Sequence, residues 1–341
     1  MVAELKQLYG KSIFLSVDVK KDYFNHTLTS VYISPQDPVE NLEERQEEIA
    51  WYLSKIFYLS PDKVADISST IAQLDTELSL EPVDMDGEEE NHLHEKYPRF
   101  DVKSFLATAL NVTTSELPEH IYIYDEGTFS NILQLVETTD EDILRDYMLW
   151  QLMEEYLVVT STMKPADREE FCTEQAKKYF GEYIDHVVYG EYRLDTYEQE
   201  LVELWQQIRS SFRKALETNS YPWMTEPVKT EALNKLNNMK LRINSYDHID
   251  FPKYFQSLEI QSHNYVENIQ NILLNRQIQV TNKLQAAAES LDTTQLFSFT
   301  PVYISSQNTI IIPVSLLQPF YFWHPVYPKT IKFATLGTLV E

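Results

Sequence analysis

The stretch from Ser60 to Leu80, "SPDKVADISSTIAQLDTELSL", shows the pattern that dominates this chain and decides its fold class. Ser60 suits an N-cap, and Pro61 suits the first helical position, where its missing N–H costs nothing. Asp62 follows, close to the positive end of the helix dipole. Apolar residues then recur at about 3.6-residue spacing, which predicts an amphipathic helix.

The same spacing recurs through most of the 341 residues and predicts a mainly α-helical protein. Further helices are expected at 140–159, 167–189, 195–218, 225–243 and 262–290.

Three segments depart from this helical pattern. Residues 81–98, "EPVDMDGEEENHLHEKYP", place seven acids around two prolines and a glycine, which is typical of an exposed connection. At 301–313, "PVYI" and "TIII" flank "SSQN" and predict a short β-hairpin. The final stretch at 333–341, "FATLGTLVE", indicates the start of another helix.

The composition excludes several classes of function. With 53 acidic against 28 basic residues, the net charge of -25 repels phosphates, so we expect no nucleic-acid partner. Only 6 glycines are present, and neither phosphate-loop motif occurs, which disfavours nucleotide chemistry. No stretch approaches the ~20 apolar residues of a membrane span, and the opening residues contain no apolar signal sequence. The sequence therefore predicts neither an anchor nor a leader, and it leaves the localisation and the oligomeric state open.

Metal-ligand patterns are weak. The zinc motif His-Glu-x-x-His does not occur. The nearest group is His92 and His94 beside Glu90 and Glu95, but these lie in a charged loop without an apolar frame, so we expect solvated residues there. The run "DMDG" at 84–87 has its glycine in the wrong register for a calcium loop. We therefore predict no metal ligand in these 341 residues.

Nucleophilic chemistry also lacks support, so we predict no catalytic residue. Cys172, the single cysteine, is expected in the middle of a helix on its apolar face, as a buried core thiol. His186 and Trp205 have the same core interpretation. The two Asn-x-Thr tripeptides, at 25–27 and 111–113, occur about as often by chance and carry no weight.

Residues 221–243, "YPWMTEPVKTEALNKLNNMKLRI", carry a more specific signal. Five of them fit the pattern Trp-Met-Asp-x-x-Thr-Lys-x-x-Ala-x-x-Lys, namely Trp223, Met224, Lys229, Ala232 and Lys235. This helix is characteristic of the neprilysin and endothelin-converting enzyme family of zinc metallopeptidases, which the chain resembles. Thr225 replaces the family's Asp, and both residues cap helices. Asn244 stands where the family has Gly, and we expect it to adopt the left-handed conformation.

Two further segments support the resemblance. The helix "FCTEQAKKYFGEYIDHVVYGEY" at 171–192 is similar to a family helix in which Cys172 matches a disulfide cysteine whose partner is lacking here. The segment at 303–322, "YISSQNTIIIPVSLLQPFYF", is similar to the family's Tyr-x-x-x-x-Asn-x-Ile-x-x-Pro-x-x-Leu-Gln-Pro-Pro-Phe-Phe. The positions that coincide are Asn308, Ile310, Pro313, Leu317, Gln318, Pro319 and Phe322.

The resemblance also identifies a candidate substrate-binding position. An Asn-Ala pair that the family uses to hold the substrate backbone falls at Thr300 and Pro301, where proline removes a backbone donor from a strand edge. Gly337 and Val340 align with the approach to the family's zinc helix, and Glu341 is the last residue before the expected first zinc histidine.

The resemblance implies a division into a helical region at 1–299 and an incomplete start of a catalytic domain at 300–341. It implies that a full-length parent cleaves peptides with zinc, and that the family is largely plasma-membrane or secreted. Because the zinc ligands are absent, we expect this chain to hold no cofactor and to be inactive. Two alternatives stay open: a non-catalytic relative that binds peptides or proteins through an acidic helical surface, and a helical interaction protein unrelated to peptidases.

Overall fold

The structure is a computed structural model of the chain. It describes residues 1–36, 39, 42–79, 88–89, 97–157, 165–192, 195–218, 223–244, 246, 249–286, 300–313, 316, 324 and 326–338. The chain forms two compact units, which are Met1–Thr162 with Tyr254–Leu291, and Met163–Lys253 with Asp292–Glu341. Both are mainly helical and each contains a small sheet, so the predicted fold class is confirmed.

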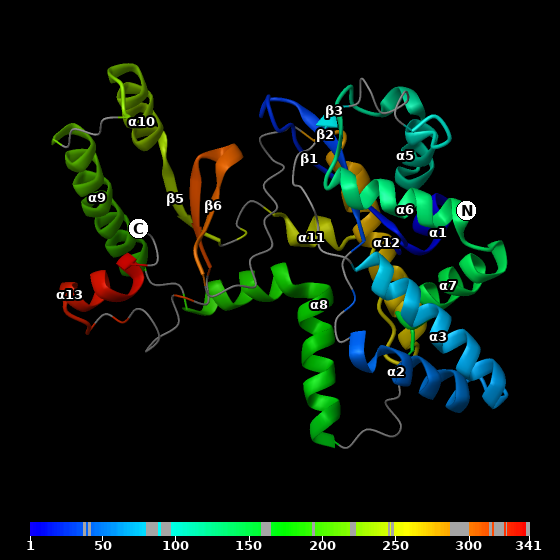
Figure 1. The fold of residues 1–341 in the computed structure, drawn as a ribbon. Coiled ribbons are helices and arrows are strands. Elements are labelled where there is room, and N and C mark those ends of the chain that lie inside the picture. Colours follow the sequence, from blue (N-terminus) through cyan, green and yellow to red (C-terminus); the bar gives the residue numbers. More distant parts are fainter. Residues whose placement is uncertain are drawn as a thin grey trace. The chain divides into compact units, whose positions relative to one another are not determined.

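The first unit combines helices with a four-stranded sheet (Figure 1). Its helices are α1 (Val2–Tyr9), α2 (Leu42–Lys55), α3 (Pro61–Leu78), α5 (Val102–Leu110), α6 (Glu126–Thr138), α7 (Glu141–Glu154) and α12 (Tyr265–Lys283), with a 3-10 turn η2 (Thr114–Glu116). The strands are β1 (Leu15–Lys21), β2 (Thr29–Pro35), β3 (Glu88–Glu89) and β4 (Ile121–Ile123), in the order β1-β2-β4-β3. β1 and β2 are antiparallel, whereas β2 and β4 are parallel. The sequence analysis did not predict this sheet.

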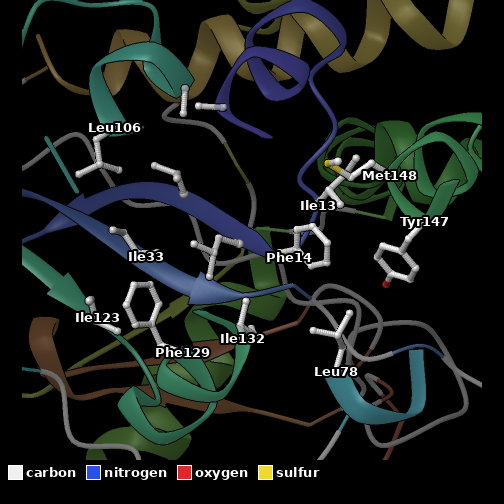
Figure 2. Packing of buried hydrophobic residues seen from close by; sticks show 14 of the residues in the cluster. Ile13, Phe14, Ile33, Leu78, Leu106, Ile123, Phe129, Ile132, Tyr147 and Met148 are labelled. Atoms are coloured by element: carbon white, nitrogen blue, oxygen red, sulfur yellow. The ribbon is translucent and has the colours of Figure 1, made fainter. Parts of the chain in front are cut away.

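A continuous apolar core holds the first unit together (Figure 2). Val19 and Ile33 from the sheet and Phe129 from α6 are completely buried in it. Phe14 stacks on Tyr147 of α7 with ring centroids 5.3 Å apart. The sheet and the helices therefore share one core, as a layered domain requires.

Two buried carboxylates are held by hydrogen bonds in this unit. Asp22 accepts from the backbone N–H groups of Phe24 and Asn25 and from the hydroxyls of Ser30 and Tyr122. These four donors stabilise the ionised form and lower the pKa of Asp22, although burial acts in the opposite direction.

Asp75 is the centre of the second polar cluster. Its carboxylate accepts from Arg45 Nε at 2.7 Å, from the Tyr147 hydroxyl at 2.8 Å and from the Gln151 amide at 3.0 Å. Arg45 also donates from both terminal nitrogens to Glu154 of α7. This cluster ties together α2, α3 and α7 with every buried charge paired.

The second unit contains the long helices α8 (Pro165–Tyr192) and α9 (Asp195–Thr218), followed by α10 (Glu226–Asn238). Its sheet has strands β5 (Lys240–Ile243), β6 (Val302–Ile304) and β7 (Thr309–Ile312) in the order β5-β7-β6. A 3-10 turn, η4 (Ser305–Gln307), joins β6 to β7. The described C-terminal part forms α13 (Lys329–Lys332) and a π-helical turn, η6 (Phe333–Gly337). A short helix, α11 (Phe251–Tyr254), lies where the chain passes between the units.

Most predicted elements are confirmed. Pro61 occupies the first turn of α3, and Ser60 is its N-cap without a side-chain cap bond. The expected helices at 140–159, 167–189, 195–218 and 262–290 correspond to α7, α8, α9 and α12. The expected hairpin at 301–313 is formed by β6 and β7, which are antiparallel.

Several details differ from the sequence analysis. The helix expected at 225–243 ends at Asn238, and the following residues form β5, because they pair with β7. The C-terminal helix begins at Lys329, before the expected 333. Within the expected connection at 81–98, Glu88 and Glu89 form β3 against β4. Residues 80–87 and 90–96 lie outside the described part.

Two residue-level predictions are wrong. Asn244 does not adopt a left-handed conformation, because its N–H donates to the carbonyl of Ile312 and so continues the sheet. Left-handed backbone occurs instead at Tyr246, two residues later, with φ of 55°, and at Asn308 at the end of η4, with φ of 48°. Cys172 is exposed and does not lie in the core.

Candidate functional site

The three-stranded sheet of the second unit is built from strongly β-forming residues. All four residues of β7, "TIII", are buried between its two neighbours. β5 pairs with β7 in parallel, and β6 pairs with it antiparallel, with Tyr303 opposite Ile310. β6 is therefore an edge strand within the described part of the chain.

Asn308 fixes the turn between β6 and β7. Its left-handed backbone, which Asn tolerates better than most residues, turns the chain into β7. Its side-chain amide donates to the carbonyl of Lys235 at 2.8 Å, and its side-chain oxygen accepts from the Tyr303 hydroxyl at 3.0 Å. These bonds attach the hairpin to the end of α10.

A cavity of about 670 Å³ lies between this hairpin and the two helices α9 and α10. This volume falls in the range of small-ligand sites. Apolar and aromatic side chains form most of its wall, and they come from α9, α10, β6, β7 and η6. They are Trp205, Ile208, Phe212, Ala215, Leu236, Met239, Pro301, Tyr303, Ile310 and Phe333.

Two cations also line the cavity. Lys235 Nζ lies 5.3 Å from the ring centroid of Tyr303, a cation–π distance. Arg209 Nη1 makes one long contact of 3.5 Å to the carbonyl of Asn237. No Asp or Glu lines the cavity, and neither cation forms an ion pair with a carboxylate of the described residues. The wall is thus apolar with an excess of positive charge.

The structure brings one of the two predicted substrate-binding residues to this cavity. Pro301 lines the cavity directly before β6, and Thr300 is exposed one residue earlier. Sequence reasoning missed Arg209 and Phe212. The sequence did contain a signal for them. Trp205, Ile208 and Phe212 recur at helical spacing on one face of α9, and an arginine lies on that same face.

The remaining candidates do not form a second site. The His92, His94 and 84–87 patterns lie outside the described residues. Where the chain is described, no three His, Cys, Asp or Glu side chains come together as a metal-binding group. His186 is half-buried with its ring 5.1 Å from that of Phe251, and Trp205 is only 8% exposed, so both fit their predicted packing roles.

Among the described residues, no helix is both long enough and apolar enough to cross a bilayer.

Two solved structures share the fold of this chain. The zinc metalloprotease Zmp1 of Mycobacterium tuberculosis superimposes with a TM-score of 0.76 at 14% identity, covering 99% of this chain and 56% of that chain. PepO of Lactobacillus rhamnosis superimposes with a TM-score of 0.74 at 14% identity, covering 99% and 59%. This likeness shows that the chain has the fold of part of a metallopeptidase of this kind.

Sequence comparison then gives the family. Residues 1–247 match the profile of peptidase family M13, and the chain belongs to this family. Endothelin-converting enzyme-like 1 of Rattus norvegicus is 20% identical over 319 residues, covering 88% of this chain and 39% of that protein. Human endothelin-converting enzyme 1 is 25% identical over 263 residues, covering 69% and 33%. The chain thus spans well under two thirds of the length of these relatives.

Proposed function

We propose that residues 1–341 form a peptide-binding part of an M13-family zinc endopeptidase, with β6 as the strand to which an extended peptide adds. The observation that carries this proposal is the position of β6 at the edge of its sheet, beside a cavity of suitable size. An exposed strand edge gives affinity through main-chain hydrogen bonds, and adjacent pockets give specificity through side chains. Family membership supports a peptide as the ligand.

We also propose that these 341 residues do not cleave peptides by themselves. A zinc peptidase uses the metal to polarise the carbonyl and to form hydroxide at neutral pH. The His-Glu-x-x-His motif is absent from the sequence, and the described residues supply no fitting ligand group. Zinc-dependent cleavage would therefore belong to a polypeptide that also contains this motif.

The test uses the purified 341-residue chain. Zinc content is measured by mass spectrometry, and cleavage is measured with a quenched fluorescent peptide, with and without a chelator. Binding of fluorescein-labelled extended peptides is measured by polarisation. Stoichiometric zinc with chelator-sensitive turnover would refute the proposed inactivity. Absence of binding for all peptides at millimolar concentration would refute the peptide-binding role.

Pro301 allows a sharper test of the strand edge. Proline has no N–H, so the variant Pro301→Ala restores one donor beside β6. One additional hydrogen bond contributes about 0.5–1.5 kcal/mol, so we expect peptide binding to tighten by about two- to tenfold. Pro61→Ala, in a helix of the other unit, is the matched control and should leave binding unchanged. Equal affinities for Pro301→Ala and the parent chain would count against binding along this edge.

The alternative of a non-catalytic binding protein has its own supporting observation. Successive turns of α2 expose Glu43, Glu44, Glu47 and Glu48, and the chain carries a net charge of -25. Such a surface suits a basic partner. Sequencing the transcript separates the two functions, because an in-frame His-Glu-x-x-His beyond residue 341 supports the peptidase and a stop codon supports the binding protein.

A further inference from the structure

We infer that the cavity beside β6 selects peptides that carry a large apolar residue and an acidic residue two positions apart. This inference rests on the proposed function, because it assumes that a peptide adds to the edge of β6. It goes beyond that function by naming the side chains that the site prefers.

The spacing follows from the alternation of side chains along a strand. Pro301 and Tyr303 are two residues apart, and both line the cavity. Residues i and i+2 of a strand lie on one face of the sheet, so this face of β6 is the one that borders the cavity. A peptide strand added to the edge continues the same alternation. Its residues i and i+2 would therefore face the cavity together.

The apolar preference follows from the wall of the cavity. Phe212 is 55% exposed and Tyr303 is 39% exposed, and the buried Trp205 and Leu236 line the same cavity. A volume of about 670 Å³ accommodates a large side chain together with a second group. Covering these rings with an aromatic or long aliphatic side chain removes apolar area from water on both partners.

The acidic preference follows from the charges. Arg209 and Lys235 line the cavity without an ion-pair partner among the described residues, although α9 is rich in acids. Two of these acids are already paired, Glu200 with Lys332 and Glu203 with Lys329. A chain with a net charge of -25 otherwise repels acidic peptides, so attraction at this position is a local property of the site.

The experiment uses a panel of labelled, end-capped pentapeptides, with binding to the 341-residue chain measured by polarisation. Thr-Phe-Thr-Glu-Thr and its reverse order, Thr-Glu-Thr-Phe-Thr, test the two strand directions, and the tighter one is the reference. Replacing Glu by Lys should weaken binding about tenfold, because attraction becomes repulsion at two partly exposed cations. Replacing Phe by Ala should weaken it by a similar factor. Moving Phe and Glu to adjacent positions should also weaken binding, since they then face opposite sides.

Variants assign the preference to the cavity. In Arg209→Gln with Lys235→Gln, we expect the preference for Glu over Lys to disappear. Ala215→Phe, which fills the cavity from α9, should remove the preference for Phe over Ala. Lys240→Gln, an exposed cation at the start of β5 on the opposite edge of the sheet, is the control and should leave both preferences intact.

The outcomes separate this inference from the proposed function. If no peptide binds, the proposed function fails. If all peptides bind with equal affinity, or if the double glutamine variant keeps the full preference for Glu, peptide binding stands and the inferred specificity is wrong. Circular dichroism spectra that match those of the parent chain establish that each variant is folded.

Discussion

Replacing Gly10 by alanine should destabilise the first unit strongly, because two separate costs add at this position. Gly10 ends α1 in the left-handed conformation, with φ of 68°, and its N–H donates to the carbonyl of Lys6 at 2.8 Å. A non-glycine residue in this conformation costs about 1 kcal/mol. The second cost is steric. A Cβ atom on Gly10 would lie 2.5 Å from the carbonyl oxygen of Leu273 and 2.6 Å from its carbonyl carbon.

The atoms that the new methyl group meets belong to the backbone of α12, so a side-chain rotation cannot relieve the clash. Either α1 or α12 must move, and overpacking of this kind costs about 1–3 kcal/mol. We therefore expect Gly10→Ala to lower the free energy of unfolding by about 2–4 kcal/mol. This is a large part of the ~5–15 kcal/mol that stabilises a typical domain.

The assay is urea unfolding combined with hydrogen exchange of the amides in α1 and α12, which reports on the first unit specifically. Gly190→Ala is the matched control. Gly190 lies in α8 with no positive φ, and an added Cβ would meet nothing within 4 Å. That variant should therefore be neutral or more stable by up to about 1 kcal/mol. An ordinary surface substitution changes the free energy of unfolding by roughly 0.5 kcal/mol. If Gly10→Ala changes it by no more than this, the close approach of α1 and α12 is refuted.

Two further predictions concern the buried carboxylates. The hydrogen bonds to Asp22 lower its pKa in the folded state, so its stabilising contribution is present above the unfolded pKa and is lost as the pH falls through the folded pKa. In urea unfolding at a series of pH values, Asp22→Asn should be less stable than the parent chain by about 2–3 kcal/mol at pH 7, and this difference should decrease in acid. A difference that stays constant with pH would contradict the argument. Arg45→Met leaves Asp75 buried without its cation and should lower the free energy of unfolding by about 3–5 kcal/mol. The double variant Arg45→Met with Asp75→Asn should recover part of this loss in the same measurement. If it recovers none, the loss of the charge pair is not the cause.

The helices could be predicted from the sequence because their signals are local. Pro61 and the apolar spacing after it define α3, and Thr225 stands at the N-cap of α10 as expected. Neither cap needs a side-chain bond to mark the helix start, since the backbone preferences of the residues suffice. The β6–β7 hairpin was predictable for the same reason, because β-branched runs flank a short turn.

The strands that pair over long distances could not be predicted in this way. Lys240 to Ile243 continue the apolar spacing of α10, and they form a strand only because β7 lies alongside them, with Lys240 opposite Thr309. β1 did carry a local signal, since Val17 and Val19 are buried and Asp18 between them is not. Its partner in the sheet is β2, and β4, which pairs with the other edge of β2, has only three residues.

The position of Cys172 shows a different limit. The prediction placed Cys172 on the apolar face of its helix, but α8 is kinked at Phe180, where φ is -129° and ψ is 23°. The buried Tyr189 lies beyond the kink, and Cys172 lies before it. The apolar spacing cannot be carried from one half of α8 to the other, because the direction of each helix face changes at the kink.

The cavity is the feature furthest from sequence-level prediction, because no single segment contains it. Its wall combines α9 and α10 with a hairpin that follows them by about sixty residues in the chain. The second unit's apolar core also joins segments that are distant in the chain, since Leu204 of α9 packs with Ile312 of β7 and Leu316. The border at 299/300 stays a prediction, and the second compact unit, Met163–Lys253 with Asp292–Glu341, contains residues on both sides of it. Helix α9 shares this core with strands β5 and β7. The same packing places Arg209 and Lys235 in the wall of the cavity, beside the edge strand where we propose that peptides bind.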